Sequence, residues 1–234
     1  MMDITGIVAV KGEFEAEGLS RDSVAAEALF AARHALPYLV KIGGCEAKSD
    51  MRFLMMMGID RIVAPMIESA FAMRKYMAML PAGAFHHVGV TIETVDAVQR
   101  IDQILDAGTK LTEVTIGRTD LTDSYGGSGV DSPETIGMVK TVARAARARG
   151  LGVTMGGSVN KRTFELLHND AELASLLDAV ETRKCVMPIA SALKPGALEV
   201  AFGVEKALLQ LQQTAFGNIV KAAEQRLGQL QARV

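Results

Sequence analysis

Residues 89–126 read GVTIETVDAVQRIDQILDAGTKLTEVTIGRTDLTDSYG, and this stretch decides the fold. A β-branched run over 88–92 ends in the carboxylate Glu93, and a second run over 111–116 is followed by Gly117 and Asp120. The residues between the runs place apolar side chains at helical spacing: Val95, Val98, Ile101, Ile104 and Leu105. The pattern predicts strand, helix, strand, with an acid just past each strand.

The same alternation continues on both sides of this stretch. Strands are predicted at 4–10, 38–42, 60–66, 88–92, 111–116, 151–155 and 177–180. Strongly apolar strands separated by helices are typical of a parallel sheet covered by helices. Because no glycine fingerprint follows the first strand, we expect a TIM-type (β/α) barrel and not a dinucleotide-binding sheet. Only seven strands are recognised, so either an eighth is hidden or the barrel lacks its usual first strand.

The length of 234 residues predicts a single (β/α)-barrel domain over 1–234. A long C-terminal helix is expected over 199–231, with apolar residues every three or four positions from Leu208 to Leu230. This helix packs either on its own barrel or on a neighbouring subunit. We expect an oligomer contact, and therefore a homo-oligomer, because the apolar stripe continues so far past the last strand.

The net charge of −2 argues against nucleic acid and against a membrane surface as partners. The N-terminus has no basic region followed by an apolar run, so no signal peptide is expected. The two cysteines, Cys45 and Cys185, provide no disulfide framework and favour a reducing compartment. We therefore expect a cytoplasmic protein.

Glu93 and Asp120 are the candidate metal ligands. Parallel strands end at one edge of the sheet, so two acids that are distant in sequence can converge there. Mg²⁺ prefers oxygen ligands and takes one or two carboxylates, leaving other positions to water and substrate. The alternative is two solvated acids at helix N-termini, where the helix dipole favours them.

Charged residues or glycine turns follow nearly every predicted strand, which is where barrel enzymes carry their chemistry. Alternation places Lys11 and Glu13 on one side of the first strand, and Lys41 shares a side with Leu39. If these sides face the lumen, Lys41 and Arg118 could bind an anionic substrate. The alternative for each lysine is an ion pair with a neighbouring glutamate.

Four stretches resemble the HpcH/HpaI aldolase/citrate lyase family, within the phosphoenolpyruvate/pyruvate-binding barrel superfamily. They are LVKIGG, IVAPMIES, VTIET, and IGRTDL followed by SYG, and the resemblance covers about 7–157. It implies that Glu93 and Asp120 bind Mg²⁺ or Mn²⁺, which would hold the keto and carboxylate oxygens of a pyruvate-like substrate. It also implies that backbone amides around 117–120 help to hold the carboxylate.

The sequence departs from the family pattern at two positions. Aldolases of this family usually read Gly-Glu-His after the equivalent strand, whereas this chain has Phe14, which cannot transfer a proton. Lys41 stands where the family has an arginine that binds a substrate oxygen, so the charge is kept but the planar fork is lost.

The function that these features favour is a divalent-metal-dependent carbon–carbon lyase acting on a small oxo-acid, or its CoA ester, through a metal-stabilised enolate. The predicted catalytic residues are Lys41, Glu13, Lys11 and Glu46. The predicted substrate-binding residues are Gly117, Arg118, Thr119, Glu68 and Gly156. Two alternatives remain: a Schiff base on Lys11 or Lys41, and a non-catalytic or repurposed oxo-acid-binding barrel.

Overall fold

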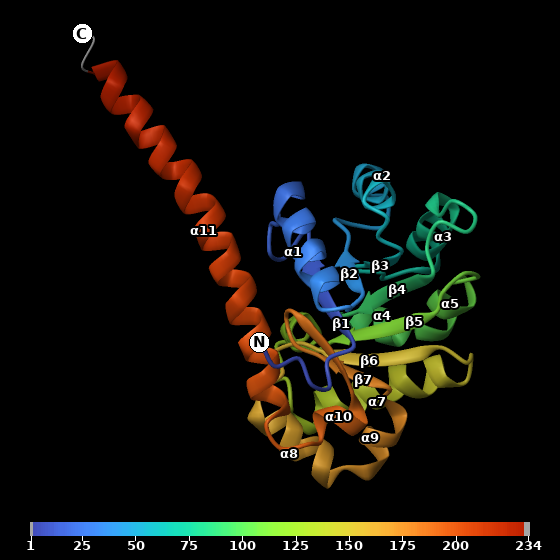
Figure 1. Ribbon diagram of the computed structural model, residues 1–234. Helices are drawn as coiled ribbons and strands as arrows, with labels where there is room; N and C mark the ends of the chain where they lie inside the picture. The colour runs from blue at the N-terminus through green and yellow to red at the C-terminus, as the bar shows by residue number, and fades with distance from the viewer. Residues whose placement is uncertain (1, 232–234) are drawn as a thin grey trace.

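The computed structural model describes residues 2–231 and shows a closed barrel of eight strands surrounded by helices (Figure 1). Sequential strands are neighbours around the whole barrel. The strands are β1 (Ala9–Glu13), β2 (Tyr38–Lys41), β3 (Arg61–Ala64), β4 (His87–Ile92), β5 (Glu113–Gly117), β6 (Gly152–Gly156), β7 (Ala179–Glu181) and β8 (Cys185–Pro188). The predicted (β/α) barrel is therefore confirmed.

Strand β8 is the one strand of residues 2–231 that the sequence did not reveal. It runs antiparallel to both β7 and β1, whereas all other neighbouring pairs are parallel. A tight turn over 182–184 reverses the chain, with the amide of Thr182 donating to the carbonyl of Cys185. Without β8, strands β7 and β1 would leave two open edges with unpaired backbone groups. The hidden eighth strand thus closes a barrel of seven parallel strands.

Most of the helices cover the outside of the barrel between the parallel strands, and the last two follow β8. They are α1 (Arg21–Arg33), α2 (Lys48–Met56), α3 (Ala70–Met79), α4 (Val95–Gln99), α5 (Ile101–Asp106), α6 (Arg118–Ser124), α7 (Pro133–Arg147), α8 (Lys161–Asn169), α9 (Ala171–Leu176), α10 (Ile189–Ala192) and α11 (Ala197–Gln231). Side chains of Ser20, Ser69, Thr94 and Ser132 accept amide hydrogen bonds at the starts of α1, α3, α4 and α7. These capping residues explain why the helices begin where they do.

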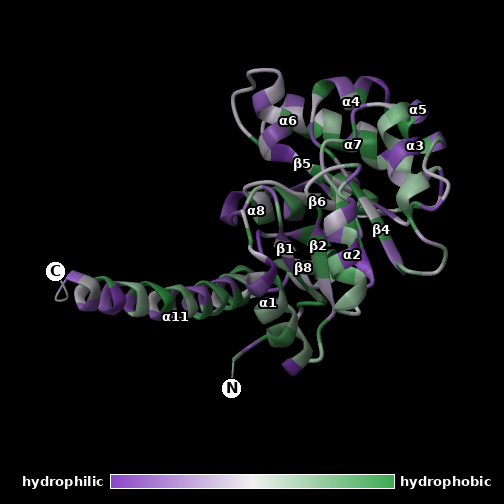
Figure 2. Cartoon of the chain, turned by 90° about the horizontal axis from the view of Figure 1, so that it is seen from above, coloured by the Kyte–Doolittle hydropathy of each residue, from purple (hydrophilic) through white to green (hydrophobic). Residues whose placement is uncertain are grey.

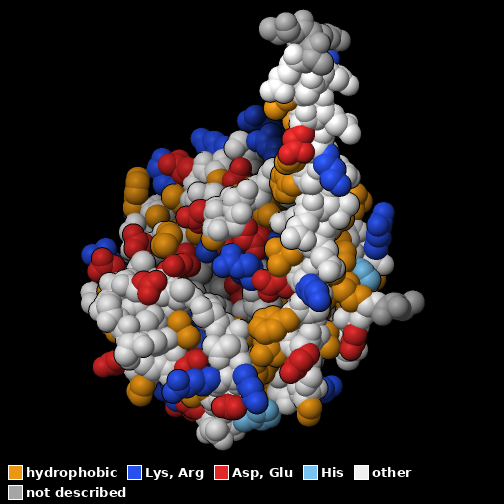
Figure 3. All heavy atoms as spheres, turned by 90° about the vertical axis from the view of Figure 1, so that its left-hand side faces the viewer, with side chains coloured by type: hydrophobic (Ala, Val, Ile, Leu, Met, Phe, Trp, Pro, Cys, Tyr) orange, Lys and Arg blue, Asp and Glu red, His pale blue; other side chains and the backbone are white. Residues whose placement is uncertain are grey.

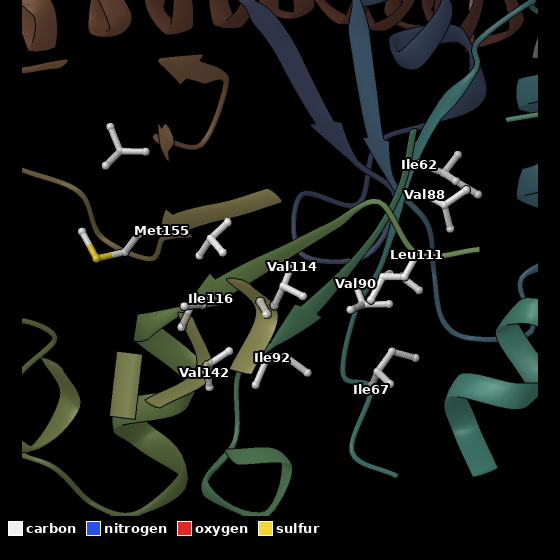
Figure 4. Close-up of a cluster of buried hydrophobic side chains, with 14 of the residues drawn as sticks. Ile62, Ile67, Val88, Val90, Ile92, Leu111, Val114, Ile116, Val142 and Met155 are labelled. Carbon is white, nitrogen blue, oxygen red and sulfur yellow. The ribbon is translucent and has the colours of Figure 1, made fainter. Parts of the chain in front are cut away.

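The main hydrophobic core lies between the strands and the helices. Figure 4 shows strand side chains such as Val90, Val114 and Ile116 packed with Ile67 and with Val142 of α7. Alternate strand residues face the lumen, where a second, smaller apolar cluster lies. This cluster consists of Ala9, Leu39, Val63, Ala179 and Val186.

The register of β4 to β7 arranges the lumen in rows. Thr91, Thr115 and Thr154 are partners across β4, β5 and β6. Two residues further along, Gly117 pairs with Gly156, so this row has no side chains on β5 and β6. The two glycines leave space at the carboxyl ends of the strands, between the residues that end β4 and β7.

Helix α11 leaves the barrel after its first turns. Ala201, Val204 and Leu208 are buried, whereas the side chains beyond Leu208 are exposed or only half-buried. Figures 1 and 2 show the rest of the helix projecting away from the barrel, with apolar and polar residues mixed along it. The predicted long C-terminal helix is confirmed. Among residues 2–231, no helix has the length and apolarity that a membrane span needs.

The predicted helix between 95 and 105 is two short helices. It breaks at Arg100, which ends α4 and begins α5. Helices α6, α9 and α10 were not recognised from the sequence. Helix α6 matters most, because it begins directly after β5 and carries Arg118, Thr119 and Asp120.

Candidate active site

A cavity of about 330 Å³ opens at the carboxyl ends of the parallel strands. Acidic and basic side chains crowd this face beside the base of α11 (Figure 3). The residues that line it come from the ends of six strands or from the segments that follow these strands, and from α11: Lys11, Glu13, Ala16, Lys41, Thr91, Glu93, Gly117, Thr119, Asp120, Gly157, Ser158, Val159, Glu181, Thr182, Arg183, Phe202 and Glu205.

Glu93 is fixed at one side of the cavity, and its side chain is only 2% exposed. Its Oε1 accepts a 2.9 Å hydrogen bond from the amide of Met66, and its Oε2 lies 3.4 Å from Nζ of Lys41. Met66 has a φ of 51°, a left-handed conformation that is costly for a residue with a side chain. The strained residue is the one whose amide donates to Glu93.

Gly117 makes room for the carboxylate of Glu93. A Cβ atom at this position would lie 2.7 Å from Oε2 of Glu93, so any side chain here would displace that carboxylate. Gly156 serves Glu181 on the other side, because a Cβ there would lie 2.9 Å from Oε1 of Glu181. The paired glycines therefore allow two glutamates to lean inward over the row of threonines.

Asp120 lies in the first turn of α6 and lines the same cavity as Glu93. Burial raises the pKa of Glu93, and the negative charge of Asp120 raises it further, against the opposing effect of Lys41 and of the Met66 amide. Two carboxylates 27 positions apart in sequence thus interact electrostatically, as the strand geometry predicted. Mutual repulsion of this kind is relieved by a shared cation.

The donor set fits a divalent metal ion. Five carboxylates and three cationic side chains line the cavity, so a dication would offset the excess negative charge. Among residues 2–231, no group of three His, Cys, Asp or Glu side chains is placed to hold a metal ion. The chain offers the two carboxylates that Mg²⁺ commonly uses, with its other positions left to water and substrate. Glu93 and Asp120 would be the residues that hold it.

A buried ion-pair network forms the floor on the opposite side. Nζ of Lys11 lies 2.6 Å from Oε1 of Glu181 and 2.8 Å from Oε1 of Glu13. Burial acts to lower the pKa of Lys11, but the charges of Glu181 and Glu13 outweigh it and raise the pKa above its ordinary value. Lys11 is thereby held as an ammonium ion, which disfavours the Schiff-base alternative at this residue.

Glu13 is held as a carboxylate. Its burial acts to raise its pKa, but Lys11, with smaller contributions from Lys41 and Arg183, lowers the pKa overall. Its neighbour Phe14 contacts Phe53 of α2 at a ring distance of 6.2 Å and does not line the cavity. The position at which the family resemblance leads us to expect a histidine is therefore used for packing.

Four predicted site residues are not brought to the cavity wall. Arg118 is fully buried and turned away: Nε donates to the carbonyl of Gly156 at 2.9 Å, and the guanidinium also bonds the carbonyl of Gly157 and the carboxylate of Asp131. The guanidinium therefore ties α6 to the end of β6 and is not positioned to bind substrate. Glu46 is exposed and pairs with Lys75 at 3.3 Å. Glu68 is exposed, and neither it nor Gly156 lines the cavity.

The remaining predicted residues, Lys11, Glu13, Lys41, Glu93, Gly117, Thr119 and Asp120, do line one cavity. The sequence-based choice missed others: Glu181, Arg183, Ser158, Phe202 and Glu205. Glu181 and Arg183 stand at the end of a recognised strand, so position alone could have indicated them. Phe202 and Glu205 reach the mouth from α11, and no local signal marks that approach.

The chain matches the family model described as HpcH/HpaI aldolase/citrate lyase over residues 22–176. Solved structures share the fold. An HpcH/HpaI aldolase from Desulfitobacterium hafniense DCB-2 has a TM-score of 0.59 and 18% identity, over 84% of this chain and 82% of that one. The citrate synthase SbnG has a TM-score of 0.63 and 13% identity, over 90% and 86%.

A third solved structure, an HpcH/HpaI aldolase/citrate lyase family protein from Burkholderia cenocepacia J2315, has a TM-score of 0.63 and 13% identity over 88% and 84% of the two chains. No match was found among curated proteins. The family model spans well over half of the chain, and the fold of the solved structures agrees with it. The chain belongs to the HpcH/HpaI aldolase/citrate lyase family.

Proposed function

We propose that this protein is a divalent-metal-dependent carbon–carbon lyase that acts on a small oxo-acid or its CoA ester. The family is one of aldolases and citrate lyases, which supports a lyase-type reaction. The observation that carries the proposal is the convergence of Glu93 and Asp120 in one cavity, where the charge of one raises the pKa of the other. Bound there, Mg²⁺ or Mn²⁺ would supply Lewis-acid stabilisation of the enolate charge that develops on the substrate oxygens.

Lys41 and the start of α6 bind the acid end of the substrate. Nζ of Lys41 lies beside Glu93 and borders the cavity, so it is placed to neutralise a substrate carboxylate. Thr119 and Gly117 line the wall next to it. Gly157 allows this wall to form, because a Cβ at Gly157 would lie 2.5 Å from the amide nitrogens of Arg118 and Thr119.

Glu13 and Lys11 carry the proton chemistry. In aldol cleavage, the carboxylate of Glu13 accepts the hydroxyl proton while the carbon–carbon bond breaks and its electron pair passes to the oxo-acid. Lys11 keeps Glu13 ionised between turnovers through an ion pair of 2.8 Å, and it also pairs with Glu181 at 2.6 Å. The low pKa of Glu13 is consistent with a base that is unprotonated before reaction.

The test measures exchange of the methyl hydrogens of pyruvate with D₂O by proton NMR, using enzyme stripped with a chelator. Exchange should appear on addition of Mn²⁺ or Mg²⁺ and should fall at least a hundredfold in Glu93→Gln and Asp120→Asn. Asp123→Asn is the matched control, since Asp123 is exposed on α6 and lies outside the cavity. Equal rates with and without metal would contradict the proposal.

A second candidate function is a non-catalytic barrel that binds an oxo-acid. Phe14 favours it, because the residue packs against Phe53 and leaves no proton-transfer group at that position. In that case pyruvate would bind in a metal-dependent manner, but there would be no turnover for a variant of Glu13 to change. The exchange measurement separates the two functions directly.

We also propose a cytoplasmic homo-oligomer in which α11 contacts a neighbouring subunit. Large apolar residues are exposed along its projecting part: Leu209, Leu211, Phe216, Ile219, Val220 and Leu227. Exposed apolar stripes of this kind are typical of protein interfaces. Light scattering should give a mass above 24.9 kDa, falling toward it after Ile219→Lys and Leu227→Lys together.

A further inference from the structure

Three buried polar atoms in the barrel strands have no hydrogen-bond partner among the described residues. They are Nε2 of His87 on β4, Oγ1 of Thr115 on β5 and Oγ1 of Thr154 on β6. Thr115 is 2% exposed and Thr154 is fully buried. Buried polar groups in folded proteins are almost always satisfied, by protein or by bound water.

The strand register places these atoms on one side of the lumen. Thr115 pairs with Thr91 and with Thr154, and Thr91 lines the active-site cavity. Glu113 precedes Thr115 by two residues and therefore faces the lumen one row lower, nearer the amino ends of the strands. Rows along a strand are about 7 Å apart, and a water molecule between polar side chains of adjacent rows would have the two or more polar partners that buried water needs. The apolar lumen cluster, which comes from β1, β2, β3, β7 and β8, covers the other side.

Glu113 and His87 lie at the lower end of this series of polar side chains, near the amino ends of the strands. Oε1 of Glu113 lies 3.9 Å from Nε2 of His87, too far for a direct hydrogen bond and suited to a bridging water. The side chains are 21% and 16% exposed, so both reach solvent at the amino ends of the strands. Burial raises the pKa of Glu113 to about 7, and the charges of Glu181 and Asp178 add to the rise. The charge of Arg61 opposes it, as does the hydroxyl of Thr154, which lies near the carboxylate without a well-formed hydrogen bond.

His87 is neutral at physiological pH. Burial, followed by the charge of Arg61, lowers the pKa of His87 to about 4, against the opposing charge of Asp60. Its Nε2 can then serve as one end of a water-mediated hydrogen bond. The charged and titratable groups that face Glu113 are Arg61 on β3, His87 on β4, Glu181 on β7 and Asp178 in the loop before β7.

Glu181 lies at the upper end of this series of polar side chains, near the carboxyl ends of the strands. It leans over Gly156, lies in the row directly above Thr154, and is paired with Lys11 in the cavity. We propose that bound water along Thr115 and Thr154 joins Glu181 to Glu113, and that Glu113 supplies protons through this water to the cavity floor. The proposal that Glu113 supplies protons rests on the proposed lyase function. The proposal that water is bound in the lumen does not.

The proton balance is simple. When the enolate carbon takes a proton from the Lys11 ammonium, Lys11 regains one through Glu181 and the water, and Glu113 loses one. The proton that Glu13 accepted from the substrate hydroxyl leaves to solvent at the cavity mouth, so each turnover takes up one proton and releases one. Glu113 regains a proton from solvent at the amino ends of the strands. No oxidant, reductant or additional reactant is needed.

The first test is a high-resolution crystal structure of the wild-type enzyme and of Thr154→Val. We expect ordered water within 3.2 Å of Oγ1 of Thr115 and Thr154 in the wild type, and its loss beside position 154 in the variant. A lumen without water in the wild type overturns the proposal, whatever the activity of the enzyme.

The second test measures pyruvate hydrogen exchange against pH in Glu113→Gln, Thr115→Val and Thr154→Val. Each should lower the exchange rate about fivefold or more with an unchanged KM, and Glu113→Asp should restore part of it. Thr141→Val, on the exposed face of α7, is the matched control and should behave as wild type. Unchanged rates in all three variants, in an enzyme with a hydrated lumen, overturn the proton supply. An enzyme that shows no exchange with any metal fails the proposed function and the proton supply together, while the crystal structure still decides the bound water.

Discussion

Nζ of Lys41 lies 3.4 Å from Oε2 of Glu93, across the wall shared by β2 and the end of β4. The proposed substrate-binding lysine and the candidate metal ligand are therefore neighbours, and the charge of Lys41 acts on Glu93. The positive charge of Lys41 lowers the pKa of Glu93, which burial and Asp120 otherwise raise. Changing one residue should consequently disturb both functions.

Replacing Lys41 by Met should weaken both oxo-acid and metal binding. Loss of the positive charge lets the pKa of Glu93 rise further, so Mn²⁺ binding should require a higher pH than in the wild type. The KM for the oxo-acid should rise at least tenfold, which corresponds to about 1.4 kcal/mol. Calorimetric titrations with Mn²⁺ between pH 5.5 and 8.5 check the shift, and Lys41→Arg should restore the wild-type profile. An unshifted Mn²⁺ profile in Lys41→Met would contradict this coupling.

Gly117→Ala should remove metal binding while leaving the barrel folded. The new Cβ would lie 2.7 Å from Oε2 of Glu93 and would push the carboxylate away from the cavity. We expect the Kd for Mn²⁺ to rise at least tenfold. Gly137→Ala on α7 is the matched control, because a Cβ there meets nothing within 4 Å. That variant should bind Mn²⁺ normally and gain up to about 1 kcal/mol of stability from better helix propensity.

Glu113→Gln should change how stability depends on pH. The pKa of Glu113 is raised from 4.5 to about 7, so between these values the folded state binds more protons than the unfolded state. The wild type therefore loses stability as pH rises through this window, by about 3 kcal/mol at most. The glutamine variant lacks that loss. Urea unfolding should show the free energy of unfolding of the variant rising relative to that of the wild type from pH 5 to pH 8. A constant difference would contradict the raised pKa of this partly buried acid.

Glu27 should be one of the most sensitive positions for stability. It is fully buried on α1, where Lys184 lies 2.8 Å from Oε1, Tyr38 donates to Oε2 at 2.8 Å, and Gln212 of α11 donates to Oε1 at 2.7 Å. Glu27→Ala leaves the Lys184 ammonium with fewer partners in a buried site and should cost about 3–5 kcal/mol. Urea unfolding measures this cost, and Glu165→Ala on the exposed face of α8 should cost under about 0.5 kcal/mol.

The parallel part of the barrel could be predicted because each strand is a short β-branched run followed by a helix with a clear start. The strand that closes it could not. Residues 185–188 are only four in number, follow a three-residue turn, and run against the direction that the βα repeat implies. Pairing of β8 with β1 depends on contacts far apart in sequence, which no local pattern encodes.

The candidate site shows the same division. Residues that end a strand, such as Glu93 and Lys41, reached the cavity because the strand fixes their direction. Arg118 did not, since it begins a helix that the sequence did not reveal, and its guanidinium is drawn to Asp131 and to carbonyls at the end of β6. Side chains on loops and helix starts depend on partners that are known only once the fold is known.

The most direct test of the account is an anomalous difference map from crystals soaked with Mn²⁺ and oxalate, a non-reactive relative of the pyruvate enolate. We predict a single strong peak in the cavity within about 2.3 Å of carboxylate oxygens of both Glu93 and Asp120, with oxalate completing the coordination. A cavity with oxalate bound to Lys41 but without a manganese peak, or a peak that contacts neither carboxylate, would contradict the account.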